Sequence, residues 1–458
     1  MIRRVARACA VLGLCVPLGL EAQLDVEPHR ASSDQLIQAA LRDSSAYQRL
    51  ARLVDGFGHR MTGAQSLERA LDWIVAEMKR DGFENVRKEP VTVPHWVRGA
   101  ESAELILPRR MKLHMLGLGR SVGTPEQGIR ARVLVVRSFA DLRARAADAR
   151  GKIVLYNVPF TEYGRTVAYR GAGADSASAV GAVAALVRSV TPQSLRTPHT
   201  GGMNYDSTGR LRKIPAAAVS VEDAEMLQRM QDRGERIEVR LRMAARMLPP
   251  TRSHNVVAEI RGSERPDEVI VMGGHIDSWD VGQGAMDDAG GCVAAWEALR
   301  LIKALGVRPK RTIRVVLWTA EEIGLHGAFA YRDQHRAEVE KHVLAMESDN
   351  GVFTPRAVRF GGGAGGLAMM QRVASLLGRG GVDTAVVGGP QADISPLYAL
   401  GVPVATIDTD QSKYFWYHHS EADMLDKLDA MDLAKNVAIL AVIANVAANM
   451  EGTFPRLR

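Results

Sequence analysis

Residues 268–288 read EVIVMGGHIDSWDVGQGAMDD, and this stretch indicates the fold. It begins with a continuous apolar strand, passes His275 where the strand ends, and reaches Asp287 and Asp288 at the start of a predicted helix. Further apolar strands, separated by predicted helices, are expected at 311–318, 342–347 and 402–408. Apolar strands that alternate with helices are typical of a parallel sheet buried on both faces. We therefore expect an α/β protein with a mostly parallel central sheet.

Potential metal ligands follow each of these strands. They are His275, then Glu321 and Glu322 in LWTAEE (317–322), Asp349 in MESDN (346–350), and His419 in YHHSEAD (417–423). The ligand site of an open α/β sheet lies beyond the carboxyl ends of its strands, so these side chains should meet at one rim. Several carboxylates at one rim would repel one another strongly unless cations neutralise them. The pattern therefore predicts a metal centre.

A centre with two divalent ions ~3.5 to 4 Å apart needs one bridging carboxylate and terminal ligands for each ion. Asp287 suits the bridge. His275 with Asp349 would hold one ion, and Glu322 with His419 would hold the other. Two histidines and three carboxylates favour zinc, with cobalt or manganese as possible substitutes.

Two further residues are candidates for supporting roles. Glu321 is adjacent to a ligand in sequence and free to act as general base on the attacking water. Asp277 follows His275 by two residues and is placed to hold its second ring nitrogen, as metal-binding histidines usually require. We expect both to act in catalysis.

The motifs GGHIDSWDVGQGAMDD, LWTAEE, MESDN and YHHSEAD together resemble the zinc aminopeptidase and glutamate carboxypeptidase superfamily, and the similarity runs from about residue 40 to the C-terminus. The resemblance implies a phosphorylase/aminopeptidase-like α/β/α sandwich, a homodimer, and a dizinc exopeptidase that acts on dipeptides or peptide ends. It also implies the metal-ligand and general-base roles given above and a cis peptide between Asp287 and Asp288.

One position departs from the wider superfamily. Many aminopeptidases carry a tyrosine before the last ligand, where it stabilises the tetrahedral oxyanion, whereas this chain has His418. An imidazole can donate the same hydrogen bond, and Tyr417 competes for the role. The sequence does not choose between them.

The middle of the chain is expected to form a separate module. Its sequence pattern changes to short β-branched runs, which predict strands at 130–136 and 151–158. A helix of small residues is predicted to follow over 179–190. We divide the chain into a signal peptide (1–22), the first part of the catalytic domain (23–110), an insert (111–247) and the rest of the catalytic domain (248–458). By resemblance the insert is β-rich and protease-associated-like. Because it contains no predicted metal cluster, we expect it to be a lid, a specificity element or a dimerisation element.

The N-terminus is expected to direct export. Arg3, Arg4 and Arg7 precede an apolar stretch, and Leu20-Glu21-Ala22 is a cleavage signal. The mature protein would be periplasmic or secreted. Cys292 would then be its one thiol, and a lone cysteine on an apolar helix is more often a buried small hydrophobe than a nucleophile.

Composition excludes other classes of partner. The net charge of +7 is concentrated in the middle third, but the arginines there are dispersed, so no nucleic-acid partner is expected. The most apolar later stretch, 437–450, is shorter than the ~20 residues that span a bilayer and is predicted to be a core helix.

The expected substrate is a short peptide, and dipeptidase and aminopeptidase activities both remain open. A non-catalytic binding protein on the same scaffold is disfavoured because the ligand set and Glu321 are complete. A glutaminyl-cyclase-like transferase is disfavoured by the large insert.

Overall fold

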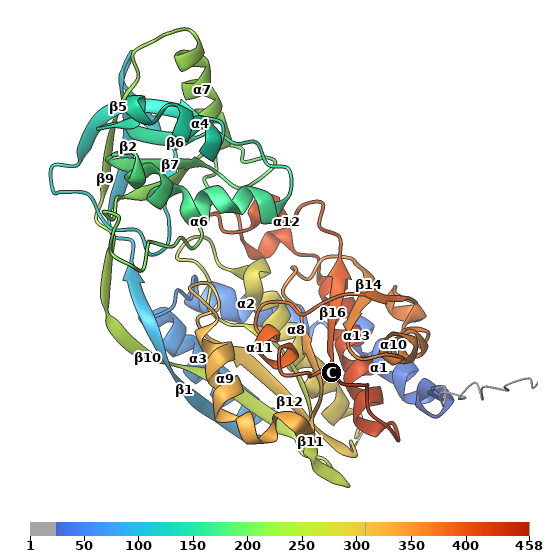
Figure 1. The fold of residues 1–458 in the computed structure, drawn as a ribbon. Coiled ribbons are helices and arrows are strands. Elements are labelled where there is room, and N and C mark those ends of the chain that lie inside the picture. The colour runs from blue at the N-terminus through green and yellow to red at the C-terminus, as the bar shows by residue number, and fades with distance from the viewer. Residues whose placement is uncertain (1–23, 307, 458) are drawn as a thin grey trace, which may run out of the picture.

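The computed structural model describes residues 24–306 and 308–457. The predicted signal peptide at 1–22 lies outside the described residues. Within them the strands form two eight-stranded sheets, one in each of two units. We call the unit that contains the predicted catalytic domain the catalytic unit. The other unit lies above it in Figure 1, and we call it the upper unit.

The sheet of the catalytic unit is parallel at its centre. β12, β11, β13 and β16 are parallel neighbours, whereas β1 and β10 join one side and β14 the other in antiparallel pairs. In spatial order its strands are β1 (Glu84–Val97), β10 (Arg246–Ile260), β12 (Arg311–Trp318), β11 (Arg265–His275), β13 (His342–Glu347), β16 (Val404–Thr409), β14 (Pro355–Gly361) and β15 (Ala385–Val387). The expected mostly parallel sheet is confirmed.

Helices cover both faces of this sheet because successive strand residues bury to opposite sides. Ile270 and Met272 of β11 pack into the core on one face, and Val269 and Val271 pack into the core on the other. The first face carries α1 (Arg30–Arg42), α2 (Ser45–Phe57), α3 (Gln65–Arg80), α8 (Gly290–Ala304), α10 (Gly366–Ala374) and α13 (Ala430–Asn449). The second face carries α9 (His326–Gln334) and α11 (Ser395–Tyr398). The α/β/α sandwich is thus present (Figure 1).

Helix α13 is the core helix expected near 437–450. Among the described residues it is the one helix long and apolar enough to cross a membrane, and 78% of its most apolar window is buried within the protein. It packs on α8 and α1, and its side chains belong to the main core.

The upper unit is built around the second sheet. In spatial order its strands are β3 (Met111–Leu113), β2 (Glu101–Leu107), β9 (Glu238–Met243), β5 (Ile129–Val136), β6 (Ile153–Tyr156), β7 (Ala184–Arg188), β8 (Ala216–Val219) and β4 (Met115–Gly117). Its helices are α4 (Phe139–Ala144), α5 (Ala146–Ala149), α6 (Tyr163–Ala179) and α7 (Val221–Asp232). With β5 to β8 parallel, the unit is a mixed α/β arrangement.

The helix predicted over 179–190 is wrong. Helix α6 ends at Ala179, and 184–188 is strand β7, which is fully buried between β6 and β8. A short apolar run buried on all sides has no periodicity that separates a strand from a helix. The upper sheet also includes β2, which lies before residue 111.

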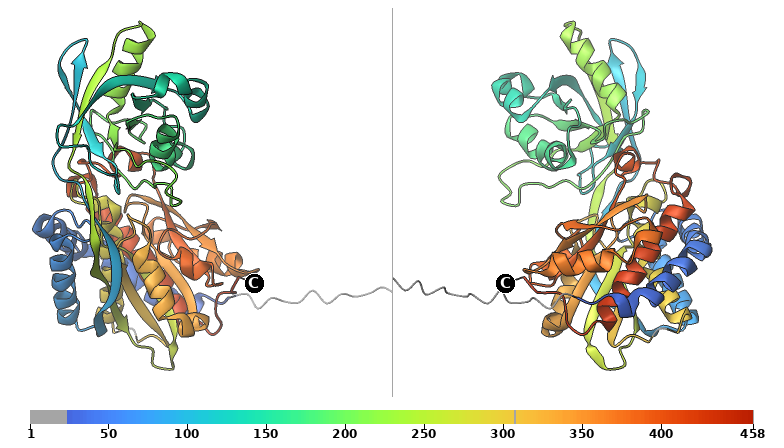
Figure 2. Two further views of the ribbon diagram at one scale, coloured as in Figure 1. Left: turned by 60° about the vertical axis from the view of Figure 1, so that its left-hand side comes forward. Right: turned by 90° about the vertical axis from the view of Figure 1, so that its right-hand side faces the viewer.

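Two long strands connect the units. The chain leaves the catalytic unit along β1 and returns along β10, and the two pair antiparallel from Glu84 opposite Glu259 to Val97 opposite Arg246. The units also meet where α12 (Tyr414–Tyr417) of the catalytic unit contacts α6, since the rings of Phe415 and Tyr163 stack with centroids 5.0 Å apart. Figure 2 shows the two units and the long strands between them from two further sides. Short 3-10 or π turns complete the fold at Glu27–His29, Ala285–Ala289, Arg336–Lys341, Gly378–Gly380 and Leu425–Lys427.

Candidate metal centre and active site

The carboxyl ends of the central strands open into a cavity of about 450 Å³ between the two units. Of the eight predicted site residues, all but Asp277 line it: His275, Asp287, Glu321, Glu322, Asp349, His418 and His419. Their strands and turns meet there because parallel strands end at the same edge of the sheet.

The Asp287 carboxylate lies between two groups of potential ligands. Its Oδ1 is 3.1 Å from His275 Nε2, which is 3.6 Å from Asp349 Oδ1. Its Oδ2 is 3.3 Å from His419 Nε2, which is 3.1 Å from Glu322 Oε2. One carboxylate therefore faces two separate pairs, and the pairs are those predicted from the sequence.

The backbone holds Asp287 in this position. It lies in a tight turn (Ala285–Ala289) before α8, and the Asp287–Asp288 peptide is cis, as the family resemblance implies. The Asp423 carboxylate accepts hydrogen bonds from the backbone N–H groups of Met286 (2.7 Å) and Asp287 (3.2 Å). Asp288 accepts from His275 N (3.1 Å). The two neighbouring aspartates thus differ in role, because Asp288 supports the backbone.

Charges in the centre compensate one another. Burial alone would raise the pKa of Asp287, but the neighbouring His275 and His419 imidazoles hold it well below its usual value. Burial together with the Asp287 carboxylate raises the pKa of Asp423 to about 7. Burial also raises the pKa of Glu321 well above the ordinary glutamate value, and the Glu322 and Asp349 carboxylates add to this effect. A raised pKa suits a group that must accept and return a proton near neutral pH.

Asp277 fixes Glu321 more directly than it fixes His275. Its Oδ1 accepts from the Glu321 backbone N–H (3.0 Å), and its Oδ2 accepts from the Thr62 hydroxyl (2.8 Å). The nearest partner of His275 Nδ1 is the backbone carbonyl of Asp277 at 3.0 Å, whereas the carboxylate is 3.7 Å away. Asp277 therefore contacts both residues, Glu321 through its carboxylate and His275 through its backbone carbonyl.

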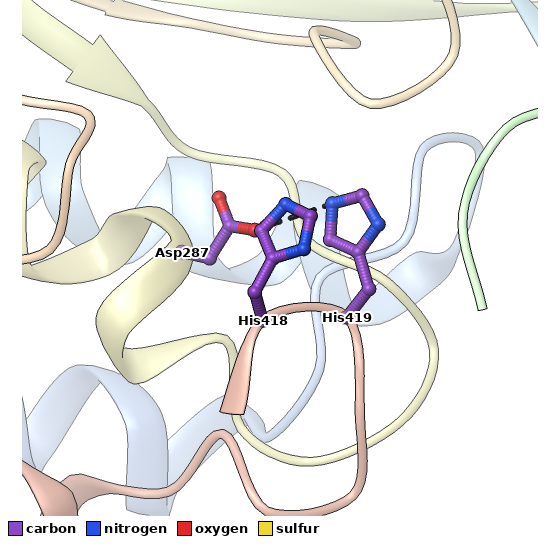
Figure 3. Close-up of side chains that lie close together, drawn as sticks. All are labelled: Asp287, His418 and His419. Atoms are coloured by element: carbon purple, nitrogen blue, oxygen red, sulfur yellow. Dashed lines mark ion pairs between the residues drawn. The ribbon is translucent and has the colours of Figure 1, made fainter. Parts of the chain in front are cut away.

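His418 is closer to the centre than the competing Tyr417. His418 Nε2 is 3.6 Å from Asp287 Oδ2, and its ring stacks on His419 with centroids 3.5 Å apart. Figure 3 shows the Asp287 carboxylate facing these two rings. Tyr417 is not among the residues lining the cavity, whereas Tyr414 and Tyr163 are. Burial and the neighbouring His419 lower the pKa of His418 well below its usual value.

Several supporting residues were missed from the sequence. Arg60 is fully buried and donates to the carbonyls of Ile276, Gln283 and Gly284, which fixes the loop between His275 and Asp287. Asp423 was visible within YHHSEAD but had no assigned role. No sequence signal identifies Arg60.

The upper unit provides part of the cavity wall. Arg120, Tyr163, Arg170 and residues 202–204 line it opposite the strand ends. The Arg170 guanidinium is 3.3 Å from His419 Nδ1 and donates to the Tyr163 hydroxyl (2.7 Å). The predicted insert thus contacts the candidate site directly.

The residues present fit a zinc centre. Asp287 Oδ2 and Glu322 Oε1 are buried oxygens with no hydrogen-bond partner among the described residues. Such atoms are costly unless a partner satisfies them. Imidazole nitrogens and carboxylate oxygens grouped around them are the donors that zinc prefers.

Comparison with known proteins gives the family. Residues 255–444 match the sequence model of Peptidase family M28. Human carboxypeptidase Q is 48% identical over 411 residues, which cover 90% of this chain and 87% of that protein. A Peptidase M28 precursor from Shewanella amazonensis has a crystal structure with a TM-score of 0.91 and 36% identity, covering 95% of this chain and 100% of that one. A zinc aminopeptidase from Bacillus subtilis, at 21% identity, shares the fold with a TM-score of 0.66, covering 87% of this chain and 93% of that one. The family resemblance read from the sequence motifs is confirmed, and the chain belongs to peptidase family M28.

Proposed function

We propose that this protein is an exported zinc metallo-exopeptidase that hydrolyses dipeptides or short peptides, with two zinc ions in each subunit. The observation that carries the proposal is the Asp287 carboxylate, whose two oxygens face two separate histidine and carboxylate pairs. The family and the named relatives support a zinc-dependent peptidase.

The proposed ligands are Asp287 as the bridge, His275 with Asp349 for one ion, and Glu322 with His419 for the other. The chemistry that bound zinc supplies is Lewis acidity toward the scissile carbonyl and the attacking water. Glu321 accepts the proton of that water and returns it to the leaving amine, and Asp277 holds the Glu321 backbone in place. His418 donates an N–H to the developing oxyanion.

The cavity supports a short substrate. Its volume of about 450 Å³ is at the lower end of the ~300 to 1,000 Å³ typical of small-molecule sites. The upper unit lies opposite the strand ends and leaves little room for a folded chain. Dipeptidase activity is therefore our first proposal, and release of N-terminal residues from longer peptides is the second.

The experiment that tests this proposal combines metal analysis with a substrate panel. The purified protein should contain two zinc ions per subunit and hydrolyse free dipeptides. A dipeptidase recognises both the free amine and the free carboxylate, so blocking either end should abolish turnover. Hydrolysis of C-terminal amides or anilides would instead show an aminopeptidase. A metal-free protein without hydrolytic activity would refute the enzyme and favour a binding protein on this scaffold.

Export and dimerisation belong to the same proposal. The signal sequence at 1–22 would deliver the protein to the periplasm or the medium, and N-terminal sequencing of the exported protein should begin near Gln23. Sedimentation should give the mass of a homodimer.

A further inference from the structure

The upper unit holds the turn that carries His418 and His419. His199 Nδ1 lies 2.7 Å from the carbonyl oxygen of His418, and the Thr200 backbone N–H donates to the carbonyl of His419 (2.8 Å). His199 and Ser420 also form an isolated antiparallel β-bridge. Two successive carbonyls of the turn are therefore bound by a segment more than 200 residues away in sequence.

This segment is itself anchored in the upper sheet. His199 is 1% exposed, and its backbone N–H donates to Ser189 Oγ (2.9 Å) just after β7. The Thr200 hydroxyl donates to the carbonyl of Gly117 in β4 (2.7 Å). The position of the turn is thus tied to two strands of the upper sheet.

The next two residues bring the segment close to both proposed ligands of one ion. Gly201 has φ +133, and a Cβ there would lie 2.3 Å from the guanidinium of Arg170, which faces His419. A Cβ on Gly202 would be 3.4 Å from the backbone oxygen of Glu322. A side chain at Gly201 would therefore displace the Arg170 guanidinium, whereas one at Gly202 would reach van der Waals contact with Glu322.

His419 needs outside support because its backbone is in the left-handed region, with φ 62. Residues other than glycine adopt this region rarely, and such positions persist when surrounding contacts determine them. The bonds from His199 and Thr200 to the carbonyls of His418 and His419 are contacts of this kind.

We propose that His199 and Thr200 are positioning residues for His419, so that the upper unit sets the affinity of the ion bound by His419 and Glu322. The inference rests on the proposed dizinc function. It also changes the role expected for the insert, because a lid would leave metal binding untouched, whereas this segment is a structural part of one ion's site.

The test measures zinc affinity, independently of activity. His199→Leu approximately keeps the side-chain volume. It breaks no hydrogen bond of Nε2, because that atom has no hydrogen-bond partner among the described residues. It should weaken one of the two zinc ions by the ~10-fold to 100-fold typical of losing a supporting contact to a ligand. His199→Asn keeps a donor at the Nδ1 position and should restore most of the affinity. The matched control is Tyr156→Phe, which removes another buried hydrogen bond to a backbone carbonyl of the upper unit, that of Gly173.

Titration of the metal-free proteins with zinc separates the outcomes. Weakening of one ion in His199→Leu, recovery in His199→Asn and wild-type affinities in Tyr156→Phe support the proposal. Wild-type affinity for both ions in His199→Leu overturns it while leaving the dizinc function intact. Wild-type protein that binds no zinc refutes the proposed function itself.

A second measurement needs no variant and covers the case in which His199→Leu does not fold. Coupling between sites is reciprocal, so zinc bound at the turn should stabilise the segment that holds it. Hydrogen exchange of the wild-type protein should slow at residues 197–202 when zinc is added, together with residues 414–423. Slowing at 414–423 alone would overturn the proposal.

Discussion

Replacing Glu321 by Gln tests the proposed general base. Gln has the same shape and leaves intact the hydrogen bond from the residue's backbone N–H to Asp277 (3.0 Å), but it cannot accept a proton. Glu321 belongs to neither of the two ligand pairs around Asp287, so metal binding should be unchanged. Loss of a general base typically costs ~10² to 10⁴-fold in rate, which is about 3 to 5 kcal/mol of transition-state stabilisation.

The assay follows kcat on a dipeptide together with zinc content. Glu321→Gln should keep two zinc ions and lose at least ~10²-fold in kcat, with KM little changed. The matched control is the adjacent Glu322→Gln, which should lose zinc, because Glu322 Oε2 lies 3.1 Å from His419 Nε2 within one ligand pair. Near-normal turnover in Glu321→Gln would refute this reasoning and return Glu322 to consideration as the base.

Three further predictions follow from the same structure. Asp287→Ala should lose both zinc ions whereas Asp349→Ala mainly weakens one, and equal single-ion losses in a zinc titration would refute the bridge. Asp423→Asn, which can accept only one of the two backbone hydrogen bonds at the bridge, should weaken zinc binding ~10-fold in the same titration, and unchanged affinity would show that the bridge needs no such support. Burial lowers the pKa of His342 from 6.5 to about 4, so its contribution to stability is complete above pH 6.5 and is lost as the pH falls toward 4. Between pH 7.5 and pH 5 that loss is about 2 kcal/mol. In urea unfolding, the free energy of unfolding of the non-titrating His342→Gln variant should fall correspondingly less over this range. Identical pH profiles for the two proteins would contradict the lowered pKa of His342.

The predicted ligand rim follows directly from the strand pattern. His275, Glu322 and Asp349 follow three parallel strands, and parallel strands bring their carboxyl ends to one edge whatever the rest of the chain does. The pairing of Glu322 with His419 does not follow from the strands alone, because the strands that precede them, β12 and β16, are not neighbours in the sheet. Local sequence and sheet topology together place these groups.

Long-range supports were not predictable in this way. Arg60 lies between α2 and α3 and binds a loop more than 200 residues later, and its own neighbourhood gives no sign of that partner. The same holds for His199, whose contact with the His418 carbonyl joins residues more than 200 positions apart. The helix predicted over 179–190 failed because its small apolar residues are compatible with either structure until β6 and β8 are placed beside them.

The contacts between the two units also constrain how substrate enters. A lid that opens as a rigid body would pull the segment 199–202 away from the turn that carries His419, and the ion bound there would lose a proposed ligand. The paired strands β1 and β10 connect the units on one side, and the bonds to the His418 and His419 carbonyls connect them at the site. We therefore expect the cavity wall formed by Tyr163 and Arg170 to keep its position relative to the ligands. Under the proposed function, selection for short peptides would then come from a wall of constant position, and substrate would pass through the opening that the folded protein already has.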